Sequence, residues 1–149
     1  MLLFQCFITI SKEKAFVQDK QQIIKYRINK AWESFDSAKL LLEAQHYYSS
    51  INRIYYACFY MVTALLFLKD LSSSKHSGVK ALFNREIVNK GLIDLKWGSF
   101  YSRLFMSRQA TDYEDLKYLD YEFVQYRFTQ AYEFLCCLES FINENLSEP

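Results

Sequence analysis

Glycine and proline are scarce in this chain of 149 residues, which contains three glycines and one proline. A β-sandwich with many turns needs far more turn residues, and no alternation of strand and helix patterns suggests a parallel sheet. Apolar residues make up 51% of the chain and aromatic residues 18%, which excludes a disordered or fibrous protein. The sequence therefore predicts a single all-α domain built from long helices.

Net charge is nearly absent as well, because 18 basic residues are balanced by 17 acidic ones. General electrostatic attraction to nucleic acid is therefore not expected, and any such contact must come from a local basic patch. Histidine is rare: His46 and His76 lie far apart, without cysteine or carboxylate ligands at useful spacing. No glycine-rich phosphate loop and no Ser/His/Asp constellation is recognisable. We therefore expect neither a metal site nor a cofactor.

Features of secreted and membrane proteins are missing too. The opening MLLFQCFITI is apolar but lacks the basic residue and the cleavage site of a signal peptide. It is too short to span a bilayer, as is the apolar stretch Ile54–Leu68. Reduced thiols are favoured for the four cysteines, Cys6, Cys58, Cys136 and Cys137. The sequence thus favours a cytoplasmic protein without membrane contact.

Two long amphipathic helices are predicted from apolar residues that recur at spacings of three and four. The stripe of the first, within residues 21–44, is Ile24, Ile28, Ala31, Phe35, Ala38 and Leu42. The stripe of the second, near the C-terminus, is Val124, Phe128, Ala131, Leu135, Leu138 and Ile142. Residues 49–69 are apolar on all sides, which predicts a central helix covered on several faces. The matching stripes favour a bundle with shallow crossing angles.

Two further helices are predicted between the central helix and the last one. The first covers about residues 77–89, with a cap at Ser74 or Ser77 and an end at Gly91. The second begins within residues 92–99 and ends near Ala110. The predicted fold is an up-and-down bundle of four main helices plus one shorter helix.

A few polar residues interrupt the apolar segments or stand at helix ends. They are Asn52 and Arg53 at the head of the central helix, Lys75 and His76 at a helix entry, and Arg108, Asp112 and Tyr113 near the end of another. Each has a structural explanation, such as capping, a side chain that reaches solvent, or an exposed ion pair. Together they form a pattern.

The segments INRIYYACFYMVTALL, KHSGVKALFNREIVNKG and LFMSRQATDYED, in this order, resemble the HEPN superfamily. The similar branch is the small single-domain prokaryotic one, which is associated with minimal nucleotidyltransferases in toxin–antitoxin pairs. The resemblance runs from about residue 31 to residue 141. We expect a HEPN-like domain over residues 19–146, and residues 1–18 are an N-terminal extension, either ordered or a poorly packed tail.

The resemblance implies a dimeric helical bundle, and in many members a metal-independent ribonuclease. The family motif is an arginine followed four to six residues later by histidine, supported by a polar residue of the second helix. Arg108 matches the arginine and Asn52 the polar residue. No histidine follows Arg108, and Asp112 and Tyr113 stand in its place. Neither is a good base at neutral pH, and His76 is a second candidate because the adjoining loop could bring it into the same cleft.

The candidate site therefore has two groups of residues. Catalytic roles are assigned to Asn52, Arg108, His76 and Asp112, and substrate-binding roles to Arg53, Lys75 and Tyr113. The expected function is that of an RNA-acting toxin. The alternative is a non-catalytic dimeric interaction module that binds a nucleotidyltransferase partner or a nucleotide, in which Tyr113, Tyr118 or Tyr121 could be nucleotidylated.

A homodimer is expected because the chain has more aromatic surface than one bundle can hide. The aromatic residues assigned to this surface are Tyr47, Tyr48, Trp97, Tyr101, Phe105 and Tyr121. We place Arg108 beside the two-fold axis, because two copies across one groove double the local positive charge.

Overall fold

The computed structural model of the protein describes the backbone of residues 2–113 and 119–146 and the side chains of residues 8–108 and 119–146. Its elements are α1 (Leu2–Glu43), α2 (Tyr47–Leu68), α3 (His76–Leu82), the π-helical η1 (Phe83–Val88), α4 (Leu95–Tyr113) and α5 (Tyr121–Leu146). The described residues contain no strand. The prediction of an all-α bundle is confirmed.

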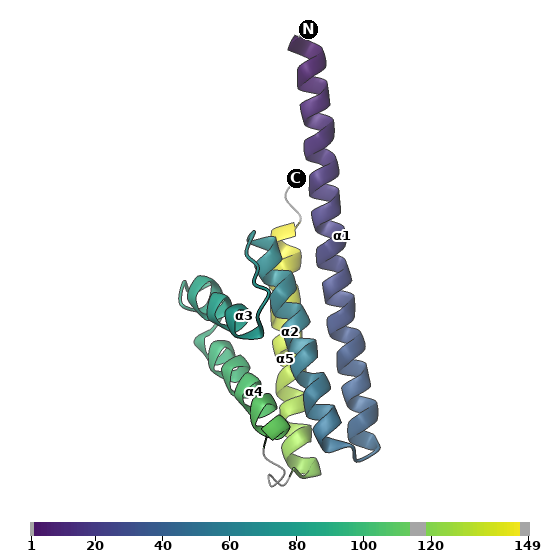
Figure 1. Cartoon of the computed structure of the whole chain (residues 1–149), viewed down its shortest axis with the longest axis vertical. Coiled ribbons are helices and arrows are strands. Elements are labelled where there is room, and N and C mark those ends of the chain that lie inside the picture. Colours follow the sequence, from purple (N-terminus) through teal and green to yellow (C-terminus); the bar gives the residue numbers. More distant parts are fainter. Residues whose placement is uncertain (1, 114–118, 147–149) are drawn as a thin grey trace.

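The bundle is organised around α2, which packs against α1, α5, α3 and α4 (Figure 1). A tight turn at Gln45, with φ of 64°, reverses the chain between α1 and α2. Both α2 and α5 run antiparallel to α1, whereas α3, η1 and α4 cover the other side of α2 (Figure 1). The N-terminal part of α1 extends beyond the bundle (Figure 1). The extension is thus continuous with the helix that carries the first core stripe.

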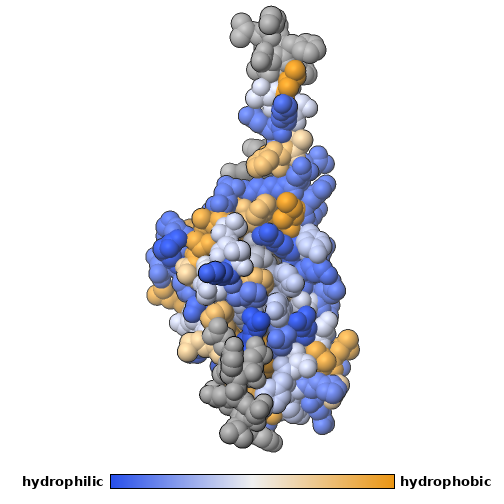
Figure 2. All heavy atoms as spheres, viewed as in Figure 1, coloured by the Kyte–Doolittle hydropathy of each residue, from blue (hydrophilic) through white to orange (hydrophobic). Residues whose placement is uncertain are grey.

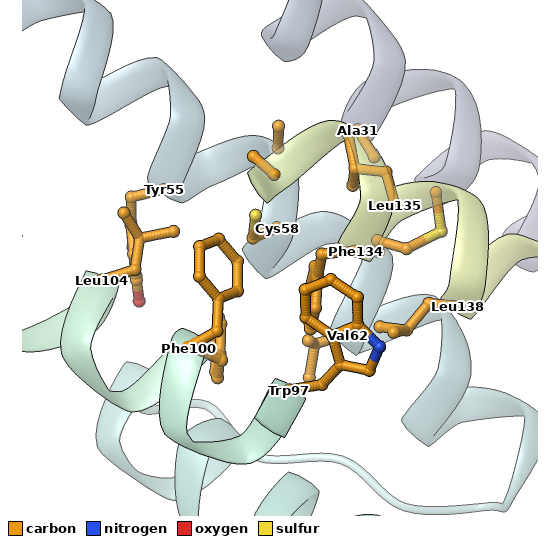
Figure 3. Close-up of a cluster of buried hydrophobic side chains, with 14 of the residues drawn as sticks. Ala31, Tyr55, Cys58, Val62, Trp97, Phe100, Leu104, Phe134, Leu135 and Leu138 are labelled. Carbon is orange, nitrogen blue, oxygen red and sulfur yellow. The ribbon is translucent and has the colours of Figure 1, made fainter. Parts of the chain in front are cut away.

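The predicted stripes meet in one core, as expected. All six stripe residues of α1 are buried, and in α5 only Phe128 is half-buried. Figure 3 shows the centre of this core, where Cys58 and Val62 of α2 face Phe134, Leu135 and Leu138 of α5. Burial raises the pKa of the Cys58 thiol, so this group is uncharged at neutral pH.

The assignment of aromatic residues to an exposed surface is wrong for three of them. Trp97, Tyr101 and Phe105 of α4 are 7%, 0% and 6% exposed. Helix α4 turns this face inward, where the Trp97 ring lies 5.5 Å from that of Phe134 (Figure 3). The Tyr101 ring lies 5.5 Å from that of Phe83. These rings fill the bundle's own core, so they cannot serve as a dimer surface.

The other three aromatic residues stay at the surface. Tyr48 is 46% exposed and Tyr121 is 49% exposed, whereas Tyr47 is half-buried. The aromatic surface that remains on these residues is smaller than the sequence suggested.

The cap of α3 differs from the predicted one. The N-cap residue is Lys75 and no side chain caps the helix, so neither Ser74 nor Ser77 has this role. Instead, the Lys75 N–H donates to the Ser73 hydroxyl at 3.3 Å. At the other end Gly91 has φ of 74°, and its N–H donates to the Val88 carbonyl, as a C-terminal glycine should.

Helix α2 is long and apolar enough to cross a membrane, and it is the one helix of the described residues that meets this criterion. Its buried residues occur all along its length, from Ser50 to Leu66. A helix enclosed by the rest of a bundle meets the same criterion, because it is apolar on all sides. Because α2 packs against four other elements, burial within the bundle explains its apolar composition.

Gly98 lies where α4 crosses η1. A Cβ atom at this position would lie 2.6 Å from Asn84 Oδ1 and 3.0 Å from Val88 Cγ1. The Asn84 side chain cannot simply move away, because its amide donates to the Lys80 carbonyl at 3.0 Å and to the Ser102 hydroxyl at 3.3 Å. A glycine within this helix is therefore explained by close packing.

We predict that Gly98→Ala destabilises the protein by about 1–3 kcal/mol, the usual cost of overpacking, despite the higher helix propensity of alanine. The neighbouring exposed variant Ser99→Ala should stay within about 0.5 kcal/mol of the parent. Urea unfolding followed by circular dichroism measures both. A Gly98→Ala protein as stable as the parent contradicts the close packing of α4 on η1.

Candidate functional site

His76 and Arg108 belong to different helices and contact each other. His76 is the first residue of α3, and Arg108 lies in the C-terminal half of α4. Nη1 of Arg108 lies 3.2 Å from Nδ1 of His76. Both side chains are half-buried, so they border the core and still reach the surface. The structure thus brings a histidine to the arginine that no histidine follows in the sequence.

Aromatic side chains of α2 hold the His76 ring in place. The ring stacks on Phe59, with 4.2 Å between centroids and an interplanar angle of 10°. The Tyr55 hydroxyl lies 2.8 Å from Nδ1 of His76, and the Tyr55 ring is fully buried. Stacking and hydrogen bonding together restrict the position and the orientation of the imidazole.

The contacts at Nδ1 determine the tautomer of neutral His76. Arginine has N–H donors and no acceptor, so the Arg108 guanidinium can face only an unprotonated ring nitrogen. Nδ1 is therefore the acceptor, and the Tyr55 hydroxyl donates to it as well. The proton of the neutral ring is on Nε2. The imidazole thus has one lone pair, directed at Arg108 and Tyr55.

The same surroundings favour the uncharged imidazole. Burial lowers the pKa of His76 below its ordinary value of 6.5, and the positive charge of Arg108 lowers it further. Burial also raises the pKa of Tyr55, although Arg108 opposes this effect. Near pH 7 the cluster therefore contains a neutral histidine, a neutral phenol and a guanidinium.

Two arginines contact the ring of Tyr56. The Arg53 guanidinium carbon is 4.7 Å from the centroid of the Tyr56 ring, and that of Arg108 is 5.0 Å from it. Arg108 also donates from Nη2 to the Tyr56 hydroxyl at 3.1 Å. Two cations on one aromatic ring form a local positive patch on a chain that is nearly neutral as a whole.

The remaining predicted site residues are Asn52, Lys75, Asp112 and Tyr113, and neither of the first two contacts His76 or Arg108 through a hydrogen bond among the described side chains. Asn52 accepts a hydrogen bond from Arg53 at 2.9 Å, so it reaches the cluster through Arg53 and Tyr56. Lys75 directly precedes His76, and its side chain is exposed. Asp112 and Tyr113 belong to the last turn of α4, and their side chains lie outside the described residues.

Sequence reasoning divides Tyr55, Tyr56 and Tyr60 between the core and the wall of the cleft, and it does not single out Phe59. Tyr55 and Phe59 are four residues apart on α2, which places them on one helical face, and the adjacent Tyr56 borders that face. An aromatic face of a core helix usually indicates packing, so only the position of α3 shows that it supports a histidine. No group of three His, Cys, Asp or Glu side chains that could hold a metal ion occurs in the part of the chain with described side chains.

Comparison with known proteins places this helical bundle in a family. The model of the HEPN domain matches residues 24–144, and the chain therefore belongs to the HEPN family. A UPF0332 protein of Thermotoga maritima is 44% identical over 86% of this chain and 97% of its own length. Two proteins of Methanocaldococcus jannaschii whose names mark them as candidate toxins are 31% and 34% identical. They cover 72% and 64% of this chain, and 74% and 72% of their own lengths.

We predict that the pKa of His76, measured by proton NMR, lies below 6.5 and rises in Arg108→Gln. It should not reach 6.5 in that variant, because burial is the larger of the two causes. His46 is the one other histidine, so a His46→Gln spectrum assigns the signals. An unchanged His76 pKa in Arg108→Gln contradicts the contact between the two side chains.

The lowered pKa also has a consequence for stability. Between the lowered pKa and 6.5 the unfolded chain binds a proton that the folded chain does not. The contribution of His76 to the free energy of unfolding is therefore fully present above pH 6.5 and is lost as the pH falls through the lowered pKa. His76→Gln should remove this part of the pH dependence in urea unfolding.

Proposed function

We propose that this chain is the RNA-acting toxin component of a pair formed with a minimal nucleotidyltransferase, and that it is a metal-independent ribonuclease. The contact between Arg108 and His76 carries the proposal, because it supplies the arginine and histidine that such chemistry uses. The relatives named as candidate toxins support the toxin role. The neutral state of His76 supports a role in proton transfer.

The proposed reaction needs a base and a cation. The 2′-hydroxyl of RNA gives its proton to Nδ1 of His76, and its oxygen attacks the adjacent phosphorus. Arg108 turns its N–H groups from His76 toward the phosphate oxygens and stabilises the negative charge of the phosphorane. The bond from phosphorus to the 5′-oxygen then breaks, and that oxygen takes the proton from the imidazolium. The products are a 2′,3′-cyclic phosphate and a free 5′-hydroxyl.

The neighbouring residues have binding and positioning roles in this proposal. Arg53 and Lys75 add positive charge near the cluster and bind flanking phosphates. Asn52 orients Arg53 through the hydrogen bond between their side chains. Asp112 orients Arg108, and Tyr113 contributes to substrate binding.

We also propose that the protein acts in the cytoplasm as a homodimer, with Arg108 beside the two-fold axis. A second copy there brings four arginines, two Arg53 and two Arg108, to one groove. Of the six aromatic residues assigned to this contact from the sequence, Tyr48 and Tyr121 remain exposed.

We predict that expression without a partner arrests growth, and that Arg108→Ala and His76→Ala each restore it. Removing a general base or a charge-stabilising donor typically slows such a reaction by about 10²–10⁴-fold. Arg103→Ala is the matched control, because Arg103 is an exposed arginine of the same helix and should leave the arrest intact. Cleavage products with 5′-hydroxyl ends, formed by the purified protein in EDTA, test the chemistry directly. Equal growth of all strains with intact tRNA and mRNA contradicts the toxin function.

A second candidate function is a non-catalytic interaction module that binds the nucleotidyltransferase or a nucleotide. The observation in its favour is that Arg108 and Tyr55 already occupy the one lone pair of His76. In this alternative the cluster is a rigid positive surface for recognition. Purified protein that leaves RNA intact but co-purifies with a nucleotidyltransferase supports this function over the first.

We predict that co-expression with a cognate nucleotidyltransferase adds the mass of one or more nucleotides to the chain, on Tyr113, Tyr118 or Tyr121. Of these three tyrosines, Tyr121 is the one whose side chain is described, and it is 49% exposed. Intact mass spectrometry of the parent and of the three Tyr→Phe variants locates the modification. An unmodified parent argues against this form of pairing.

A further inference from the structure

Helices α4 and α5 meet through aromatic rings, and each helix carries an arginine beside this contact. The Phe100 ring of α4 lies 5.3 Å from the Phe134 ring of α5. Arg103 lies three residues after Phe100, which places both on one side of α4. Arg127 lies seven residues, or about two helical turns, before Phe134 on α5. Because the two helices run in roughly opposite directions (Figure 1), both arginines lie beyond the rings toward the end of α4.

The Arg127 side chain is held in place by uncharged groups. Its guanidinium carbon lies 5.3 Å from the centroid of the Phe123 ring, and its Nη1 donates to Oε1 of Gln130 at 3.1 Å. Its Nε is buried and has no hydrogen-bond partner among the described residues. Neither a ring nor an amide neutralises a guanidinium, so Arg127 keeps its attraction for an anion.

Arg103 adds a second positive charge next to the first. Burial lowers the pKa of Arg127, and the charge of Arg103 lowers it further, so the two guanidinium groups are close enough to repel each other. Arg103 is exposed, and neither arginine forms an ion pair with another described residue. Two like charges held together without a counterion favour a ligand with negative charge.

Large exposed side chains lie next to the two arginines. Met106 lies three residues after Arg103 and is 62% exposed, whereas Tyr126 and Phe123 of α5 are 59% and 38% exposed. Arginine, methionine and aromatic residues are the types that protein interfaces contain most often relative to other surfaces. The residues of this surface, here called the α4–α5 face, are Arg103, Met106, Phe123, Tyr126 and Arg127. Their composition is typical of a protein-binding site.

Acidic residues at the border of the α4–α5 face favour a protein over RNA. Glu122 lies four residues before Tyr126 and Glu133 lies seven residues after it, and both are exposed on the same side of α5. Figure 2 likewise shows apolar residues among hydrophilic ones on the side of the bundle that bears α4. The two glutamates repel a polyanion, whereas a protein segment can place a carboxylate at the arginines and a basic side chain at the glutamates.

We propose that the α4–α5 face docks an acidic segment of the partner nucleotidyltransferase, an inference that rests on the proposed pairing. A carboxylate of that segment lies between Arg103 and Arg127, and its apolar side chains pack on the exposed rings. Arg108 is about 140° from Arg103 around α4, so the docked partner leaves the Arg108 cluster uncovered. Tyr113 ends α4 and Tyr121 begins α5, so a partner at this face lies beside the segment proposed for nucleotidylation.

Isothermal titration calorimetry of the full chain with the purified cognate nucleotidyltransferase tests the proposal. Arg103→Glu and Arg127→Gln should each weaken binding about 10–100-fold, the usual effect of removing a central interface arginine. Lys25→Glu is the matched control, because Lys25 is an exposed residue of α1 and the variant makes the same change in charge as Arg103→Glu. Circular dichroism verifies the helix content of each variant. Parent affinity in both arginine variants overturns this proposal alone, whereas a parent that does not bind overturns the proposed pairing with it.

RNA binding and self-association identify the other possible occupants of the α4–α5 face. The affinity for single-stranded RNA, measured by fluorescence anisotropy, should fall in Arg108→Ala and stay at the parent value in Arg103→Glu. The mass in light scattering should be the same for Arg103→Glu and the parent. An RNA affinity lowered in Arg103→Glu as far as in Arg108→Ala assigns the face to RNA, and a lowered mass assigns it to a second copy. Either result overturns the proposal.

Discussion

The structure depends on the burial of α2 by the helices around it. Because α2 is apolar on nearly all sides, it is stable only when α1, α5, α3 and α4 cover it together. This requirement places the loop after α2 and the start of α3 against the aromatic face of α2, formed by Tyr55 and Phe59. The same face receives the guanidinium of Arg108 from α4. The packing that forms the core therefore also brings the residues of the site together.

Among the residues whose side chains are described, aromatic rings contribute more than carboxylates to positioning the charged groups of this cluster. Arg108 packs on Tyr55 and Tyr56, Arg53 packs on Tyr56, and His76 stacks on Phe59. A ring holds a cation without neutralising its charge, so the arginines keep their attraction for an anionic ligand. The same surroundings affect His76, because burial and the charge of Arg108 both disfavour its protonation. A nearly neutral chain can in this way present a local positive patch beside a neutral base.

Helix α1 has two different environments along its length. From Ile24 to Leu42 its stripe is buried against α2 and α5. Before Ile24 the same continuous helix leaves the bundle, where Lys20 still bonds the Leu68 carbonyl and Asp70. The buried part belongs to the HEPN domain, whereas the residues before Ile24 lie outside the matched range.

The sequence by itself determined the helices and the core stripes, because hydrophobic periodicity is a local property that neighbouring residues impose on one another. It also indicated Asn52, Arg53, His76 and Arg108, since polar residues at the ends of apolar helices stand out. It could not show that His76 meets Arg108, or that Trp97, Tyr101 and Phe105 turn inward. Those contacts join residues of different helices, and they depend on how α3 and α4 cross α2 and α5. Only the tertiary structure decided them, because crossing angles arise from the packing of whole helix surfaces and not from the spacing of residues along one helix.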